Sequence, residues 1–288
     1  MSAFSHPILD AYQLLDSGNG EKLECFGGVT LRRPDPQALW RPRLDAHNWG
    51  AADYSFIRES DRGGRWEPAF KGSNDWVVNI KNAAFKISLT PFKHVGLFPE
   101  QATNWDWVAT QKKKLGDVTK PQLLNLFAYT GAASILAAQD GWRVTHVDAS
   151  RPMLDWASHN ANLSNLDSNA IRWVLDDCLK FAKREMRRGK KYEGILLDPP
   201  HYGRGPKGEK WQLELHIAPL LEACCHLLSK NKGSFLVLST YAVNYSVQAF
   251  KNVLKDFGLN QVSSGELLLP EHNSSRVLPC GTCIRFER

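Results

Sequence analysis

The second part of the chain alternates short apolar runs with stretches that have helical spacing. From residue 121 onward, each apolar run ends at a polar or acidic residue and an amphipathic or small-residue stretch follows. Strand–helix units of this length predict a doubly wound α/β sheet whose strands are mostly parallel. The predicted strands cover residues 123–127, 143–147, 171–175, 194–197, 234–239, 261–269 and 281–286, and the predicted helices cover residues 132–139, 152–163, 179–188, 212–228 and 247–257.

The first 95 residues follow a different pattern, with short apolar-containing runs and many turn residues. Runs at 12–15 and 22–26 flank the sequence DSGNG, which predicts a hairpin, and runs at 76–80 and 84–89 predict a second strand pair. We therefore expect a smaller β-rich N-terminal subdomain over residues 1–95 and a larger domain over residues 96–288. Because the first region holds no catalytic pattern, simple packing beside the larger domain is favoured, while substrate contact through its basic residues stays open.

Composition narrows the class of protein. The 288 residues carry a formal net charge of +6 and 43% are hydrophobic, so a sizeable core is expected and a polyanionic partner is compatible with the charge. No run approaches the ~20 apolar residues that cross a bilayer, and the first residues lack a signal-peptide pattern. Six cysteines in a chain of this length do not form a disulfide framework. These features predict a reduced, cytoplasmic protein without a membrane segment.

The segment 194–211 carries the first candidate chemistry. Its apolar run ends abruptly in Asp198-Pro199-Pro200, at the carboxyl end of a strand, where ligands bind in open α/β sheets. Two prolines fix the backbone, so that the Asp198 carboxylate and the proline carbonyls face one point. Such acceptors, followed by the aromatic Tyr202, suit a planar ring that bears an amine, such as a nucleobase.

A second group of residues predicts a nucleoside-binding half-site. The turn after the first strand holds one glycine, Gly131, and the next strand ends in Asp148, placed to accept two ribose hydroxyls. The three glycines that let a pyrophosphate approach the backbone are missing, which disfavours a dinucleotide. S-adenosylmethionine carries a ribose and an adenine without a phosphate, so one glycine suffices for it.

The third strand of this region adds the adenine side of the half-site. It ends in Asp176 and Asp177, and we expect Asp177 to accept the adenine amine, with Asp176 as the alternative. Ala149 and Ser150 are expected to border the same ring. A single aspartate at a strand end is weak evidence, since aspartate also caps helices. Acidic residues at successive strand ends, with Gly131 between them, form a much stronger joint signal.

These motifs resemble a known family. NLFAYTGAAS, HVDAS, LDDCLKF and LLDPPHYGRGPKGEKW are similar to motifs of the class I S-adenosylmethionine-dependent methyltransferases, above all the bacterial 23S ribosomal RNA large-subunit enzymes (the RlmI/RlmK-like group). The resemblance runs from Gly96 to the end of the chain. It implies a Rossmann-like sheet of seven strands with the last one antiparallel, S-adenosylmethionine as cofactor, and RNA, with ribosomal RNA first, as partner. It also implies these site residues: Gly131, Asp148, Asp177 and the backbone of Phe127, Ala128, Tyr129 and Thr130 for the cofactor, Gln101 at the border of that pocket, and Asp198, Pro199, Pro200 and Tyr202 facing the methyl acceptor.

Two departures from the family refine the expected function. Members that methylate carbon 5 of cytosine use a cysteine nucleophile, whereas here the fifth strand continues as STYAVNYS and His201 follows Pro200. Carbon 5 needs covalent activation, while a base nitrogen attacks with its own lone pair, so methylation of a base nitrogen is favoured. The first 95 residues do not resemble the RNA-binding PUA domain of the ribosomal enzymes. The alternatives are methylation of a small molecule or protein by the same fold, and a non-enzymatic RNA-binding protein on a methyltransferase scaffold.

The remaining polar residues have two interpretations each. Arg204, Lys207 and Lys210 either track a phosphate backbone or belong to a solvated loop, and His201 is more often structural than a base in such a position. A zinc site needs four convergent ligands, and the possible ligands are split between a helix and the end of the chain. We therefore predict no metal site at Cys224, Cys225, His226, Cys280 and Cys283.

Overall fold

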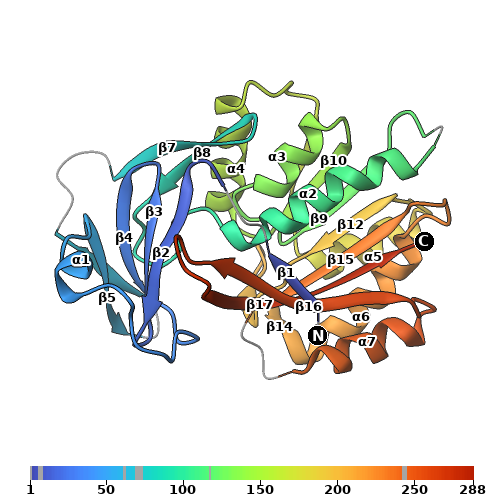
Figure 1. Cartoon of the computed structure of the whole chain (residues 1–288). Coiled ribbons are helices and arrows are strands. Elements are labelled where there is room, and N and C mark those ends of the chain that lie inside the picture. The colour runs from blue at the N-terminus through green and yellow to red at the C-terminus, as the bar shows by residue number, and fades with distance from the viewer. Residues whose placement is uncertain (1, 6–8, 61–62, 69–73, 117, 242–244) are drawn as a thin grey trace. The chain divides into compact units, whose positions relative to one another are not determined.

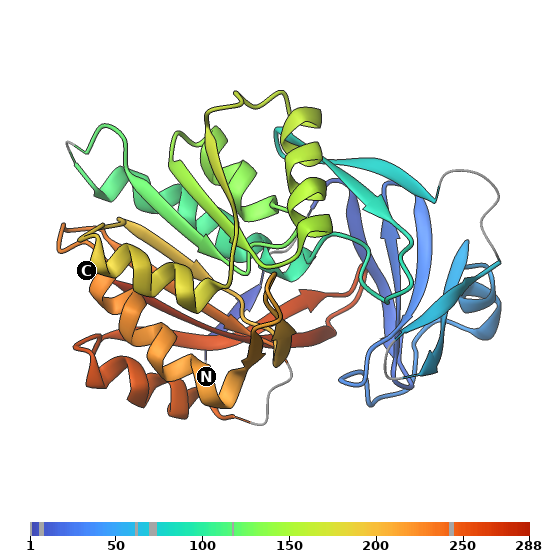
Figure 2. The same ribbon diagram turned by 180° about the vertical axis from the view of Figure 1, so that it is seen from behind.

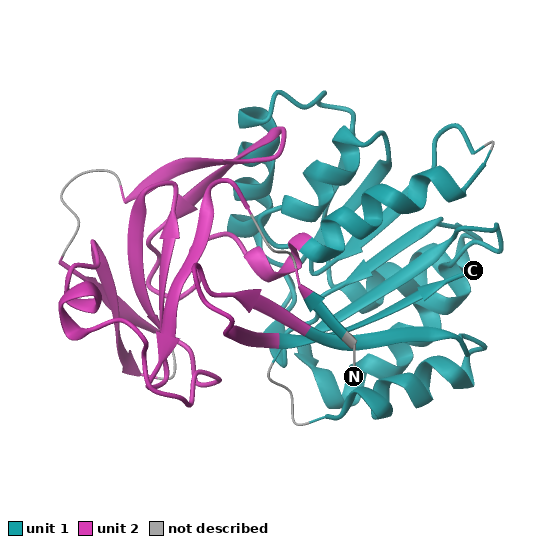
Figure 3. Cartoon of the chain, viewed as in Figure 1, with its two compact units in different colours: residues 1–4, 103–266, 281–288 teal, residues 5–102, 267–280 magenta. Residues whose placement is uncertain are grey.

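The computed structural model of the chain describes residues 2–5, 9–60, 63–68, 74–116, 118–241 and 245–288 (Figures 1 and 2). The chain divides into two compact units, which Figure 3 colours separately. Unit 1 comprises Met1–Phe4, Thr103–Glu266 and Gly281–Arg288, and unit 2 comprises Ser5–Ala102 and Leu267–Cys280. The predicted division lay at residue 95, whereas the units change at residue 102, and one late segment of the chain returns to unit 2.

The described part of unit 1 is built on a sheet of eight strands. In spatial order they are β1 (Ser2–Ser5), β16 (Val262–Pro270), β17 (Val277–Glu287), β15 (Phe235–Thr240), β12 (Gly194–Leu197), β9 (Gln122–Leu126), β10 (Arg143–Asp148) and β11 (Ile171–Leu175). The five strands from β15 to β11 pair in parallel, and β17 pairs antiparallel with β15. The predicted doubly wound seven-stranded sheet with an antiparallel last strand is confirmed, and β1 adds an unpredicted eighth strand beside β16.

Helices cover the sheet of unit 1. α5 (Cys178–Arg187) and α6 (Leu213–Leu227) lie in front of the sheet in Figure 2, whereas α2 (Ala102–Gln111) lies in front of it in Figure 1. The remaining helical elements are α3 (Ala132–Gln139), α4 (Arg151–Leu163), α7 (Val247–Asp256) and the 3-10 turn η2 (Lys112–Lys114). Every helix predicted from residue 121 onward is present, with bounds that differ by at most one residue from the prediction.

The core explains why these strands were visible as unbroken apolar runs. Every residue of β12 and β15 is buried, as expected for parallel strands covered on both faces. Side chains of α5, α6 and α7 join those of β9, β12 and β15 in one hydrophobic cluster. None of the helices in the described ranges is long and apolar enough to cross a membrane.

Unit 2 is rich in β-strands, as predicted for the N-terminal region. Its larger sheet has the order β2 (Tyr12–Gly18), β3 (Glu21–Phe26), β4 (Val29–Pro34), β5 (Tyr54–Ser60) and β6 (Gly63–Glu67). β7 (Asp75–Ile80) and β8 (Ala83–Ser88) form a separate pair, α1 (Ala46–Gly50) follows β4, and the 3-10 turn η1 (Pro99–Gln101) precedes α2. Asn19 and Gly20 form the β2–β3 turn with φ of 54° and 79°, the backbone that a two-residue Asn-Gly hairpin needs.

Candidate active site

The turn after β9 has a strained backbone that is held from several sides. Phe127 and Tyr129 adopt φ of 55° and 53°, a left-handed conformation that side-chain-bearing residues seldom take. The Phe127 amide donates to Cys178 Sγ at 3.3 Å, and the Tyr129 amide donates to Asp148 Oδ2 at 2.8 Å. The Thr130 carbonyl accepts a hydrogen bond from Asn160 Nδ2 at 2.9 Å. The turn is therefore a preformed loop at the carboxyl edge of the sheet.

Asp148 ends β10 and presents a carboxylate beside this turn. Its Oδ1 accepts from the Ser150 amide at 2.9 Å, as Oδ2 does from Tyr129. Burial raises the pKa of Asp148, and the backbone hydrogen bonds to Ser150, Tyr129 and Ala149 oppose that shift. In the described parts of the chain no basic side chain forms an ion pair with it. Each oxygen keeps acceptor capacity, so the group suits a ligand with two adjacent hydroxyl donors.

Gly131 is required by the packing of two helices. It has φ of 90° and stands immediately before α3. A Cβ at this position would lie 3.0 Å from Ala157 Cβ and 3.4 Å from Ala157 Cα, both on α4. The predicted close approach at this glycine is thus an approach of helix α4, and it brings the whole turn near the end of β10.

The two aspartates after β11 have different partners. Asp176 Oδ2 forms an ion pair with Arg184 at 2.7 Å, and its Oδ1 accepts from the Asp177 amide at 2.9 Å. Asp177 caps α5 by accepting from the Lys180 amide through Oδ1 at 2.9 Å. Asp176 is paired with a cation and each of its oxygens has a partner, whereas Asp177 uses one oxygen for the cap. The geometry therefore favours Asp177 over Asp176 as an acceptor for a ligand amine.

The acceptor motif after β12 is tied to the cofactor-side turn through Trp211. The indole Nε1 of Trp211 donates to the Pro200 carbonyl at 2.7 Å, and its ring lies 4.8 Å from that of Phe127. The Pro200 carbonyl, which we predicted to face a ligand, thus accepts one hydrogen bond within the protein and has a second lone pair.

The segment after Pro200 forms a small hairpin where the sequence suggested a loop. β13 (Tyr202–Arg204) pairs antiparallel with β14 (Lys210–Gln212). The Tyr202 side chain is 49% exposed, so its ring is accessible at the surface, while Trp211 is only 3% exposed. His201 extends toward Glu214, with 3.9 Å between Nε2 and the carboxylate, and makes no contact that marks it as a base.

One predicted cofactor residue lies in the other compact unit. Gln101 ends η1 in unit 2, so the contacts within unit 1 that join the other residues do not include it. Sequence reasoning also missed three residues that hold the site together, Trp211, Asn160 and Cys178. Trp211 carried a usable signal, since an aromatic residue stood between a glycine-rich loop and a helix, but Asn160 and Cys178 look like ordinary helix residues.

Three of the six cysteines are buried thiols. All six lie in the described ranges as free thiols, and Cys178, Cys224 and Cys283 are buried. Burial raises the pKa of each of these three thiols, which makes them inert. Among the described residues, no group of three or more histidine, cysteine, aspartate or glutamate side chains is placed to bind a metal ion.

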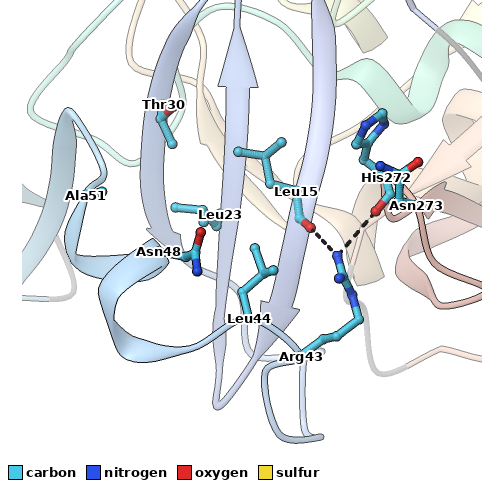
Figure 4. Close-up of a pocket in the computed structure, with 9 residues that line it drawn as sticks. All are labelled: Leu15, Leu23, Thr30, Arg43, Leu44, Asn48, Ala51, His272 and Asn273. Carbon is cyan, nitrogen blue, oxygen red and sulfur yellow. Dashed lines mark hydrogen bonds between the residues drawn. The ribbon is translucent and has the colours of Figure 1, made fainter.

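Unit 2 has a cavity of its own, which Figure 4 shows in close-up. Its volume is about 340 Å³. The Arg43 guanidinium at its edge donates to the carbonyls of Leu15 at 3.2 Å and His272 at 3.3 Å. None of the residues predicted to bind a cofactor or an acceptor lines this cavity, so the candidate site is the edge of the sheet in unit 1.

Comparisons with known proteins find methyltransferases. The chain is 37% identical to the S-adenosylmethionine-dependent methyltransferase of Agrobacterium tumefaciens, whose crystal structure superposes with a TM-score of 0.92 over 100% of this chain and 93% of that one. It is 35% identical over 158 residues to ribosomal RNA large subunit methyltransferase K/L of Shewanella frigidimarina. This alignment covers 54% of this chain and 21% of that protein. It is 26% identical over 214 residues to ribosomal RNA large subunit methyltransferase K of Neisseria meningitidis. This alignment covers 69% of this chain and 58% of that protein.

The chain thus spans between about a fifth and three fifths of the length of these curated relatives. No protein-family model matches it.

Proposed function

The chain belongs to the S-adenosylmethionine-dependent methyltransferases, and from this premise we propose that it methylates a base nitrogen of RNA, with ribosomal RNA as the first candidate. The observation that carries the proposal is the acceptor motif, where Asp198 and Pro199 are followed within three residues by Tyr202, whose side chain is exposed. The names of the curated relatives support RNA as the substrate class. A ribosomal substrate in turn implies activity in the cytoplasm.

The cofactor side of the site fits S-adenosylmethionine. When bound, the cofactor supplies a methyl group on an electrophilic sulfonium. Asp148 would accept the two ribose hydroxyls, because its half-buried carboxylate has no cationic partner in the described residues. Asp177 would accept the adenine amine, Ala149 and Ser150 would border the ring, and the backbone from Phe127 to Gly131 would form the floor. Gln101 at the border of the pocket remains part of the proposal.

The acceptor side supports a nitrogen as the methylated atom. Asp198 and Pro199 would accept the N–H groups of the base and turn the nitrogen lone pair toward the methyl group, and Tyr202 would stack on the base once it is extruded. Positioning and exclusion of water suffice for a nitrogen nucleophile. Carbon 5 of a pyrimidine needs a thiolate, and the buried thiols of Cys178 and Cys283, whose pKa values burial raises, do not supply one.

The distribution of charge supports unit 1 as the part that attracts RNA. Thirteen of the 36 basic residues and 13 of the 30 acidic residues belong to unit 2, which is therefore neutral, so unit 1 carries the whole net charge of +6. Electrostatic attraction to phosphates provides most of the sequence-independent affinity for nucleic acids.

Calorimetric titration with S-adenosylmethionine tests the cofactor assignment. Wild-type protein should bind in the micromolar range, of order −8 kcal/mol. Asp148→Ala should weaken binding about 100-fold or more, because each hydrogen bond to a charged group contributes about 1.5–3 kcal/mol. Asp155→Ala is the matched control, since Asp155 lies exposed on α4 and should bind as the wild type does. Equal affinity of the Asp148 variant would reject the ribose contact.

Methyl transfer to undermodified ribosomal RNA, compared with transfer to free nucleosides and to protein, tests the substrate. RNA methylation that falls steeply with added salt is the expected result, since phosphate contacts are lost with salt. Transfer to a small molecule or protein with little salt dependence would support the alternative function. A protein that binds RNA but transfers no methyl group from bound cofactor would fit the non-enzymatic scaffold.

A further inference from the structure

The β13–β14 hairpin has one buried face and one exposed face. The register pairs Tyr202 with Gln212, Gly203 with Trp211, and Arg204 with Lys210. Because side chains alternate along a strand and cross-strand partners share a face, Gly203 and Trp211 point inward while Tyr202, Arg204 and Lys210 share the other side. Burial agrees with this alternation, since Trp211 is buried and the other three are exposed. We call Tyr202, Arg204 and Lys210 the outer face of the hairpin.

Two cations stand directly opposite each other on the outer face. Arg204 and Lys210 are cross-strand partners, and like charges at such positions destabilise a strand pair. No acidic side chain in the described part of the chain forms an ion pair with either of them. A three-residue strand pair thus carries an electrostatic cost that nothing within the described protein relieves, and a bound polyanion would relieve it.

The one acidic residue of the hairpin is already neutralised. Glu209 pairs with Lys180 on α5 at 2.7 Å and accepts from the Lys207 amide at 2.8 Å. These contacts, with the hydrogen bond from Lys180 first, lower the pKa of Glu209 to about 2. Glu209 therefore binds the tip of the hairpin to α5 and leaves the charges of Arg204 and Lys210 uncompensated.

The inner face fixes the hairpin to the site. Trp211 donates to the Pro200 carbonyl, lies 4.8 Å from the Phe127 ring, and stacks on His216 at 5.5 Å between ring centroids. Gly203 packs over Trp211, where a Cβ would lie 3.7 Å from Trp211 Cβ. The outer face is thus held on a rigid base that follows directly from the Asp198-Pro199-Pro200 motif.

We propose that the outer face binds single-stranded RNA immediately beside the base to be methylated, with Arg204 and Lys210 on phosphates next to it. The inference rests on the proposed function, because it assigns a strand of RNA to the acceptor side of the same site. Tyr202 holds the extruded base, and the two cations, which face each other two residues further along the hairpin, hold the phosphates on one side of that base. Arginine and lysine next to an aromatic ring are the usual elements of single-strand recognition.

The test compares two double variants that remove the same charge. Arg204→Gln with Lys210→Gln removes the outer-face cations, and Lys230→Gln with Lys232→Gln removes two exposed cations from the loop that precedes β15, at the opposite end of the strands. The probe is a labelled single-stranded RNA that contains the methylation site, titrated from low to high salt. The slope of log affinity against log salt should fall by about 1.4 for the hairpin variant, or about 0.7 per phosphate contact.

That slope corresponds to roughly tenfold weaker RNA binding at about 0.15 M salt. KM for RNA should rise by the same factor, while kcat at saturating RNA and the affinity for S-adenosylmethionine stay at wild-type values. The Lys230/Lys232 variant should keep both the affinity and the slope within about twofold.

Several results would overturn the assignment. Equal losses of RNA affinity in the two double variants would show that the effect of the hairpin variant comes from net charge alone. The proposed function would not be affected by that result. RNA bound equally by wild type and hairpin variant, with polyglutamate bound by the wild type alone, would point to an acidic protein surface as the partner of the outer face. A wild-type protein that binds and methylates no RNA would reject both this inference and the proposed function.

Discussion

Gly131→Ala tests whether this glycine is required for packing against α4 or for the close approach of a cofactor. The substitution adds one methyl group at a residue with φ of 90°. An L-residue in the left-handed region costs about 1–2 kcal/mol. The new Cβ would also lie 3.0 Å from Ala157 Cβ on α4, and overpacking of this kind costs about 1–3 kcal/mol. The free energy of unfolding should therefore fall by about 2–5 kcal/mol in total, from the two contributions together.

A double-mutant cycle measures the two contributions separately, with urea unfolding followed by a signal from unit 1. Ala157→Gly alone should cost about 1 kcal/mol, because glycine is unfavourable inside a helix. Combined with Gly131→Ala, it removes the clash but not the backbone strain, so the pair should be less destabilised than the sum of the single variants by about 1–2 kcal/mol. The m-value should stay at its wild-type value in all four proteins.

Two results would refute this reasoning. Loss of less than about 0.5 kcal/mol in Gly131→Ala, within the range of ordinary surface substitutions, would mean that α4 yields without cost. Strict additivity in the cycle would mean that Ala157 does not limit the space at Gly131. If the packing account is right, the double variant should also bind S-adenosylmethionine more tightly than Gly131→Ala does, because relief of the clash restores the turn that holds Asp148.

Two further predictions concern residues behind the site. Trp211→Phe keeps an aromatic ring against Phe127 but removes the donor to the Pro200 carbonyl, so the free energy of unfolding measured in urea should fall by about 1 kcal/mol. The kcat should fall about tenfold, while the affinity for S-adenosylmethionine stays unchanged. An unchanged kcat would mean that Trp211 does not position the motif. His146 is fully buried beside Ser134, and burial lowers its pKa to about 3. Because that value lies below the unfolded value near 6.5, the stability it contributes is complete above pH 6.5 and is lost toward pH 3, by about 1.4 kcal/mol per pH unit. His146→Leu should flatten this slope in denaturation curves measured between pH 6 and 4, and an unaltered slope would contradict the assignment.

Much of unit 1 could be predicted because its strands are buried on both faces. The run that became β12 is apolar throughout and those that became β9 and β15 are mostly apolar, and this pattern does not depend on distant residues. The acidic residues that follow the strands mark their carboxyl ends, so Asp148 and Asp177 were found together with the sheet. Asp177 also caps α5, and the preference for aspartate at the start of a helix can be recognised in the sequence.

The parts that were missed are short or depend on distant partners. β13 and β14 have three residues each, too few for an alternating pattern to stand out from a glycine-rich loop. β1 has four residues and is a strand because it extends an existing sheet beside β16. The segment after β15, which lacks the cysteine nucleophile of the carbon-5 enzymes, includes residues 242–244, which lie outside the described residues.

Arg285 shows why an edge strand from the other end of the chain belongs to this sheet. It is 7% exposed on β17, and a buried cation needs compensation. Asn104 Oδ1 accepts from its Nε at 2.9 Å and from its Nη2 at 2.7 Å, and the Thr103 carbonyl accepts from Nη2 at 3.0 Å. The ring of Phe4 on β1 lies 4.2 Å from the guanidinium carbon and that of Trp107 lies 5.2 Å from it.

The compensation of this charge comes from two segments, α2 and β1, and neither contributes a carboxylate. Carbonyl and amide oxygens at the start of α2 satisfy the edge of the guanidinium, and aromatic faces from α2 and β1 lie over its plane. Asn104 also donates to Ser239 Oγ at 3.2 Å, near the end of β15, which is the strand next to the one that leads into Asp198. The same asparagine thus connects the buried cation to the edge of the sheet that bears the acceptor motif. The four-residue strand β1 thus adds an aromatic face to the environment of Arg285, a contact that no pattern local to residues 2–5 could have indicated.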